Sequence, residues 1–251
     1  MNKLQAYCLI FLPLFFSCKN ELPESRTDSR TIFDFQVLPS EKCDDSCGNK
    51  LCYSYSMNDS LKMAGSGDRL IKQCKWFFHN TNGSFETIFE SGLPQKTIYS
   101  KNNIIKWKQH RDSLYGYHLS YPANWFSVNI TDDITFNVIK DSLNLMAGEA
   151  NLVISNYDDD LGDAYEKELV EYNRRFNIQE SKVKRLNVEG MDEVVQRILK
   201  IKLNDKKIIV FQTAFANNDR VFHLTFRSEE KFFNENYFIF DHILWSIRFI
   251  K

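Results

Sequence analysis

The sequence has almost no excess of charge of either sign. Its 251 residues include 32 Lys and Arg against 33 Asp and Glu, a formal net charge of −1. A protein that binds nucleic acid usually presents a basic face, because its positive side chains neutralise backbone phosphates. We therefore do not expect nucleic acid among its partners.

The sequence also lacks the short motifs of common catalytic and cofactor sites. It contains no HExxH zinc motif, no GxSxG nucleophile elbow, no dinucleotide fingerprint and no P-loop lysine. A Ser-x-x-Lys tetrapeptide begins at Ser228, but its partner motifs are missing, and a helix cap is the favoured interpretation. We expect no enzyme, cofactor or metal site. The five histidines, which show no paired ligand spacing, are His79, His110, His118, His223 and His242.

The apolar stretch at the N-terminus is too short to span a bilayer comfortably. It runs from Leu4 to Phe16, with Lys3 before it and the small residue Ser17 after it. A spanning helix needs about 20 apolar residues. The layout is that of an export signal, so we expect a signal peptide over residues 1–17.

The end of this stretch, Phe15-Phe16-Ser17-Cys18, resembles the lipobox of bacterial lipoproteins in a relaxed form. The resemblance implies that Cys18 is lipidated and becomes the new N-terminus, with ordinary cleavage or an uncleaved anchor as alternatives. A lipoprotein carries two or three acyl chains, and two or more anchor a protein stably. Because Lys19 follows the cysteine, we expect a lipid anchor at the outer membrane of the cell envelope.

Residues 18–30 mix charge with Pro23 and show no apolar periodicity, so they predict a flexible tether between anchor and folded body. Residues 31–103 carry strand signals, among them Trp76-Phe77-Phe78 and Phe85–Phe89 across a hairpin-type connection. They predict a small β-rich module.

Four cysteines remain after Cys18, all within this module. In an exported chain an even set favours two disulfides, with three possible pairings. A zinc site or a redox pair is the alternative, although structural zinc sites usually combine two close CxxC-type pairs. The four disulfide candidates are Cys43, Cys47, Cys52 and Cys74.

From residue 106 to residue 251 the apolar pattern becomes regular. Steps of four and three from Leu161 to Phe176 predict a helix with one buried face, and a second helix is expected from about Glu229 to Leu244. Three closely spaced strands from Val194 to Arg227 must pair antiparallel. We therefore expect an α+β fold with an antiparallel sheet covered by helices, preceded by the disulfide-stapled module.

Several features of residues 106–251 resemble the PsbP-like superfamily. They are Tyr121-Pro122-Ala123-Asn124-Trp125, Asn187-Val188-Glu189-Gly190 before the meander, and a closing helix that runs into Ile243-Leu244-Trp245-Ser246-Ile247. The resemblance implies a PsbP-like αβα sandwich and a binding or assembly module. It brings no active-site residues to carry over.

Two further features concern binding and modification. The aromatic residues Tyr115, Tyr117, Tyr121 and Trp125 could line a ligand groove, with the core of the sheet as the alternative use. The tripeptide Asp-Ser-Leu, at residues 59–61, 112–114 and 141–143, resembles an acceptor for O-glycosylation of exported proteins in some bacteria.

Together these patterns favour a membrane-anchored lipoprotein that acts by binding or assembly, with an envelope protein as partner. The alternatives are an envelope hydrolase with an unrecognised active site and a redox or metal protein that uses the four cysteines.

Overall fold

The computed structural model describes residues 26–27, 33, 36–39, 52–57, 61–67, 72–80, 83–100, 103–128, 134–157, 160–188, 191 and 193–250. The expected signal peptide over residues 1–17 and the lipidation candidate Cys18 lie outside the described residues, as do Cys43 and Cys47. Of the expected tether, the description covers only Arg26–Thr27, which forms a short strand.

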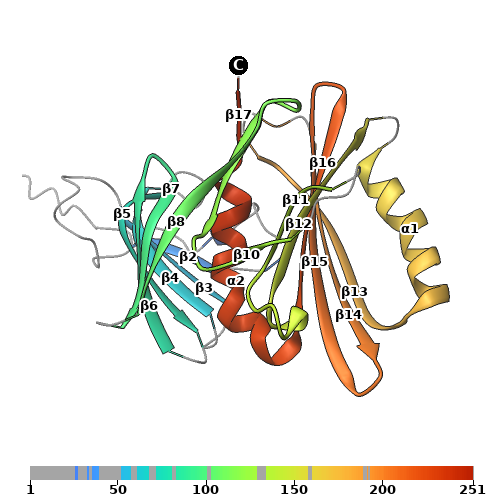
Figure 1. Cartoon of the computed structure of the whole chain (residues 1–251), viewed down its shortest axis with the longest axis horizontal. Coiled ribbons are helices and arrows are strands. Elements are labelled where there is room, and N and C mark those ends of the chain that lie inside the picture. The colour runs from blue at the N-terminus through green and yellow to red at the C-terminus, as the bar shows by residue number, and fades with distance from the viewer. Residues whose placement is uncertain are drawn as a thin grey trace, which may run out of the picture.

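The first of two antiparallel sheets is a meander of ten strands in which chain neighbours are sheet neighbours, with the closing strand β17 added beside β9 (Figure 1). Its strands are β1 (Arg26–Thr27), β2 (Gln36–Pro39), β3 (Cys52–Met57), β4 (Leu61–Gly67), β5 (Lys72–Asn80), β6 (Gly83–Glu90), β7 (Leu93–Ser100), β8 (Asn103–Asp112), β9 (Tyr117–Pro122) and β17 (Arg248–Phe249).

The second sheet has seven antiparallel strands in the order β10-β11-β12-β16-β15-β14-β13. Its strands are β10 (Phe126–Ser127), β11 (Ile134–Ile139), β12 (Glu149–Asn156), β13 (Asn177–Leu186), β14 (Val194–Leu203), β15 (Lys206–Asn217) and β16 (Arg220–Glu229). A short 3₁₀ turn, η2 (Leu145–Ala147), precedes β12.

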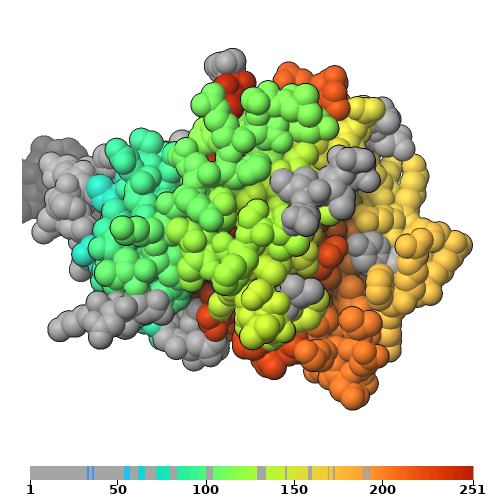
Figure 2. All heavy atoms as spheres, viewed as in Figure 1, coloured from blue at the N-terminus to red at the C-terminus, as the bar shows by residue number. Residues whose placement is uncertain are grey.

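The helix α2 (Glu230–Trp245) lies between the two sheets. It contacts β5, β7 and β9 of the first sheet and β15 and β16 of the second. On the face shown in Figure 2, side chains of residues from about 103 to 150 cover most of it. The helix therefore forms a layer of its own inside the protein.

Both long faces of α2 are apolar, which explains this position. On one face Phe238 packs 4.8 Å from the Phe78 ring of the first sheet. On the other face Phe240 stacks 4.5 Å from the Phe226 ring of the second sheet. A helix that is hydrophobic all round is a buried helix. One continuous core consequently joins both sheets.

The other helix, α1 (Leu161–Arg175), covers the outer face of the seven-stranded sheet at β13 and β14. Leu161 and Tyr165 are buried on the side that faces the sheet. Asp160 caps the helix, since its Oδ1 accepts a hydrogen bond from the Asp163 backbone N–H at 2.9 Å. The helix predicted from the spacing of apolar residues is confirmed.

The antiparallel pairing expected for the three strands from Val194 to Arg227 is confirmed as well. Asn204 and Asn218 are the first residues of two-residue turns, and both have φ of +56°. Asparagine adopts this left-handed conformation more readily than most residues, which is why such turns favour it.

The predicted fold class is wrong in its layers. We expected one sheet covered by helices behind a separate module, but the described chain is mostly strand and forms two curled antiparallel sheets with α2 between them. The strand β8 runs through the expected boundary at residues 103–106 and pairs with β7 on one side and β9 on the other. Backbone pairing and a shared core thus continue across it.

A smaller correction concerns Ser228, which does not cap α2. It is a fully buried residue of β16, and the first residue before the helix is Glu229. Among the described residues no helix is long and apolar enough to cross a bilayer.

Candidate binding site

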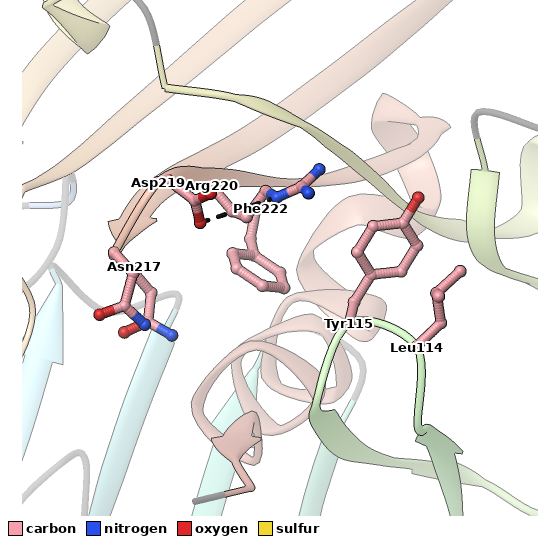
Figure 3. A pocket seen from close by; sticks show the side chains of 7 residues that line it. Leu114, Tyr115, Asn217, Asp219, Arg220 and Phe222 are labelled. Atoms are coloured by element: carbon pink, nitrogen blue, oxygen red, sulfur yellow. Dashed lines mark ion pairs between the residues drawn. The ribbon is translucent and has the colours of Figure 1, made fainter.

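A pocket of about 350 Å³ opens where the connection between β8 and β9 meets the tight turn between β15 and β16 (Figure 3). It joins one turn from each sheet, at the end of the molecule where the chain also closes with β17. We call it the turn pocket. Its lining residues are Leu114, Tyr115, Asn217, Asn218, Asp219, Arg220 and Phe222.

The Asp112 side chain shapes one wall of the turn pocket. Its Oδ1 accepts hydrogen bonds from the backbone N–H groups of Leu114 and Tyr115, at 2.9 and 3.0 Å. Gly116 follows with φ of +64°, and its carbonyl accepts a hydrogen bond from the Ile250 N–H at 2.7 Å. These bonds fix the backbone that carries the Tyr115 ring.

The opposite wall of the turn pocket carries the Arg220 cation and the Phe222 ring. The Arg220 side chain points toward the Tyr115 ring, with its Cζ 5.8 Å from the ring centroid (Figure 3). Its Nε lies 3.7 Å from Asp219 Oδ1, and Arg220 keeps 43% of its side chain exposed. Such an exposed pair is weak in water, so the guanidinium can exchange Asp219 for a ligand anion.

The other three residues of the predicted groove pack in the core instead. Tyr117 is fully buried and its hydroxyl is 2.9 Å from Thr135 Oγ1, and burial raises its pKa. Tyr121 packs edge-on against Phe136, and Trp125 packs edge-on against Phe240. They lie between strands and helix because each projects from the inner face of its strand or turn. Of the four, only Tyr115 lines the turn pocket.

A second pocket, of about 480 Å³, lies beside the loop between β11 and β12. Lys140 of this loop forms an ion pair with Glu235 of α2 and donates a hydrogen bond to Asn236 Oδ1 at 3.0 Å. Asn236 in turn donates to the Ala147 carbonyl at 2.6 Å, which fastens the loop to the helix. We call it the Phe126 pocket. Its lining residues are Phe126, Lys140, Asp141, Ser142, Leu143, Asn144, Ala147, Phe232 and Glu235.

Two serine–histidine pairs lie within hydrogen-bond distance, as a nucleophile and its base would. Ser155 Oγ lies 3.2 Å from His223 Nε2, and Ser84 Oγ lies 2.8 Å from His79 Nδ1. Burial lowers the pKa of His223, which keeps its imidazole neutral near pH 7. Neither pair lines the turn pocket or the Phe126 pocket.

The described residues contain no group of three or more His, Cys, Asp or Glu that could hold a metal ion. Of the four disulfide candidates, only Cys74 has a described side chain. Cys52 contributes its backbone to β3, and the pairing of all four stays a prediction.

Sequence reasoning missed Arg220 and the Asn217–Asp219 turn as parts of a site. Tyr115 and Arg220 are far apart in the chain, and only the contact between the two sheets brings them together. The signal in the sequence was the run of four polar residues, Asn217-Asn218-Asp219-Arg220, which is longer than a two-residue turn requires.

No family model matches the sequence, and no curated protein matches it. Among solved structures, the chain is similar to the cyanobacterial PsbP (CyanoP) of Synechocystis sp. PCC 6803, with 12% identity and a TM-score of 0.45 over 60% of this chain and 96% of that one. It is also similar to LpqN of Mycobacterium tuberculosis, described as involved in cell envelope biogenesis, with 12% identity and a TM-score of 0.45 over 61% of this chain and 95% of that one.

A third similar structure is a Pseudomonas aeruginosa protein of unknown function described as a putative regulator. It shares 13% identity, with a TM-score of 0.34 over 56% of this chain and 94% of that one. We therefore infer function from the residues of the chain itself.

Proposed function

We propose that this chain is an exported protein, lipid-anchored at Cys18 on the outer membrane, that binds an envelope protein partner and has no catalytic activity of its own. The observation that carries the binding role is the turn pocket, in which an exposed guanidinium lies next to an aromatic ring. The lipobox-like Phe15-Phe16-Ser17-Cys18 supports the anchor.

The chemistry of the turn pocket favours a partner segment with a carboxylate. Arg220 offers a planar fork of donors that matches a carboxylate, and the Tyr115 ring beside it offers an apolar surface. The exposed Leu114 at the rim adds apolar contact, since 82% of this residue is open to solvent. Buried aromatic and Arg side chains dominate the energy of protein interfaces, so Tyr115 and Arg220 would anchor this one.

The anchor is tested by growing cells that express the full chain with alkyne-labelled palmitate. We expect the label on the wild-type chain and none on Cys18→Ser. Cys8→Ser, which changes the cysteine inside the apolar run, is the matched control and should keep the label. A wild-type chain without label, or a C18S chain that retains it, would overturn the anchor.

The binding site is tested with a photo-crosslinking amino acid placed at Leu114 in intact cells. We expect one defined crosslinked product in the envelope fraction, at least tenfold weaker when Arg220→Gln is added. A crosslinker at Leu143, an even more exposed leucine outside the turn pocket, is the control and should not give that product. A product of equal yield from both positions, or one that ignores R220Q, would contradict the turn pocket as the binding site.

A further inference from the structure

We propose that Ser113 and Ser142 are O-glycosylation sites, recognised by a glycosyltransferase as Asp-Ser-Leu in an exposed turn. This inference rests on the proposed export of the chain. The tripeptide occurs three times in the sequence, at residues 59–61, 112–114 and 141–143. Chance placement of 18 Asp, 20 Ser and 22 Leu in 251 residues yields about 0.1 copies. The repetition therefore calls for a cause.

The two copies with a described turn share a hydrogen bond between the aspartate side chain and the leucine backbone N–H. In the first, Asp112 Oδ1 accepts a hydrogen bond from the Leu114 backbone N–H at 2.9 Å. In the second, Asp141 Oδ1 accepts one from the Leu143 N–H, also at 2.9 Å. The aspartate thus folds the backbone around the serine in both places. An enzyme that reads the tripeptide would meet the same hydrogen bond at two distant sites.

Both copies present serine and leucine to solvent. Ser113 and Ser142 are exposed, and Leu114 and Leu143 keep 82% and 95% of their surface open. These are the two most exposed of the large hydrophobic residues described. Neither leucine is buried in the core, so folding does not explain why the third residue of the tripeptide is apolar. The proposed partner contact accounts for Leu114 alone, whereas contact with a modifying enzyme accounts for an apolar residue in both copies.

The surroundings of Ser142 suit an attached sugar. Ser142 lines the Phe126 pocket, whose walls include the Phe126 and Phe232 rings and the ion pair of Lys140 with Glu235. Aromatic rings pack against the apolar face of a sugar, and charged groups bond its hydroxyls. The first sugar residue on Ser142 can therefore pack in a preformed hollow.

The chemical step needs a donor sugar activated as a phosphate ester, which the glycosyltransferase brings. Serine Oγ attacks the anomeric carbon and forms a new C–O bond. The bond from that carbon to the phosphate oxygen breaks, and the phosphate leaves with the electron pair. The serine proton passes to a base of the enzyme. No oxidation or reduction occurs.

The test is peptide mapping by mass spectrometry on the full chain purified from the envelope of its own host. We expect a series of sugar masses on the peptides that contain Ser113 and Ser142, and loss of each series in Ser113→Ala and Ser142→Ala. Ser91 is the matched control: it is exposed, follows an acid and lies in a tight turn, but lacks Asp and Leu. Its peptide should stay unmodified.

A second pair of variants tests recognition separately from the acceptor hydroxyl. Leu143→Ser keeps Ser142 and should abolish its modification, whereas Asn144→Ser, one residue outside the tripeptide, should leave it in place. Unmodified serines on a chain whose signal segment has been removed would overturn this inference and leave the proposed export intact. A chain that retains residues 1–17 and stays in the cytoplasm would overturn both. A phosphate mass on the serines would likewise overturn it.

Discussion

Lys72 and Asp241 form an ion pair inside the protein, with 3.2 Å between Lys72 Nζ and Asp241 Oδ2 and only 2% of each side chain exposed. Lys72 begins β5 of the first sheet and Asp241 lies in α2. Lys72 Nζ also lies 5.5 Å from the centre of the Trp76 ring and 5.4 Å from that of Phe89. The pair fastens the ten-stranded sheet to the central helix.

Replacing Lys72 by Met should destabilise the protein by about 3–5 kcal/mol, because it removes the Lys72 charge from beside the buried Asp241 carboxylate. The double variant K72M/D241L removes both charges and should be more stable than K72M alone. Urea unfolding of the wild type, K72M, D241L and the double variant gives the coupling energy. If the double variant loses as much free energy of unfolding as the two single variants lose together, the two side chains are not coupled.

A second buried cation fixes the outer helix. Arg197 of β14 is fully buried and donates to Gln212 Oε1 at 2.8 Å, to the Tyr165 carbonyl at 2.9 Å and to Glu168 Oε2 at 2.8 Å. The last two partners belong to α1, so the arginine joins this helix to the sheet beneath it.

Arg197→Met should cost about 1–3 kcal/mol, the range for buried acceptors that lose a donor. The loss should be local: amide hydrogen exchange should accelerate in α1 more than in α2. Arg174→Met removes an exposed arginine of α1 and is the matched control, with an effect within about 0.5 kcal/mol. Equal acceleration of exchange in both helices would contradict a local role.

Local elements were predictable from the sequence because short-range patterns determine them. The steps of three and four from Leu161 predict α1, and the polar turn at Asn204 separates two strands that the structure retains. The layer arrangement was not predictable in the same way. The prediction treated α2 as a helix that covers a single sheet.

The overlooked signal is the run Tyr237-Phe238-Ile239-Phe240, in which four successive residues are apolar. A helix that packs against one sheet would expose part of such a run, whereas this helix between two sheets buries all four residues. Similarly, Tyr115 was a candidate by composition alone. Its partner Arg220 comes from a different sheet, and no local pattern links two turns in separate sheets.

Stability should fall between neutral and mildly acidic pH, partly because of His223. Burial lowers the pKa of His223 below its ordinary value of 6.5, with the Arg197 charge acting in the same direction and Glu168 opposing it. His223 therefore binds a proton near pH 6.5 in the unfolded chain, but only at a lower pH in the folded chain. The His223 contribution is complete above pH 6.5 and is lost as the pH falls through the lowered folded value.

His223→Asn should flatten this dependence. We expect the free energy of unfolding, measured in urea at about pH 7.5 and about pH 5, to change less in the variant than in the wild type. Part of the dependence of the unfolding free energy on pH should remain, since burial also lowers the pKa values of His110 and His118. A variant with the full wild-type slope would contradict the role of His223.

The strand register limits which disulfides can form. Cys52 of β3 pairs with Ser66 of β4, and Ser66 pairs with Gln73 of β5, the residue before Cys74. One whole strand thus separates Cys52 from Cys74, which places their Cα atoms about 10 Å apart. A disulfide requires a Cα separation below about 7 Å. Of the three pairings, the one that joins Cys52 to Cys74 is therefore disfavoured.

We accordingly predict that Cys74 pairs with Cys43 or Cys47, and that Cys52 pairs with the other of these two. Trypsin cuts after Lys42, Lys50 and Lys72, so the three cysteine peptides are residues 43–50, 51–62 and 73–75. Without reduction all three should stay joined as one species, with residues 43–50 in the middle.

Reduction should separate this species into its three peptides. A two-peptide species of residues 51–62 and 73–75 would contradict the prediction, and so would free thiols that react with iodoacetamide before reduction. Cys74→Ser should lower the free energy of unfolding by about 2–5 kcal/mol, the usual loss for a native disulfide in a small exported domain. The loss should vanish in a reducing buffer, where the wild type has no bridge to lose.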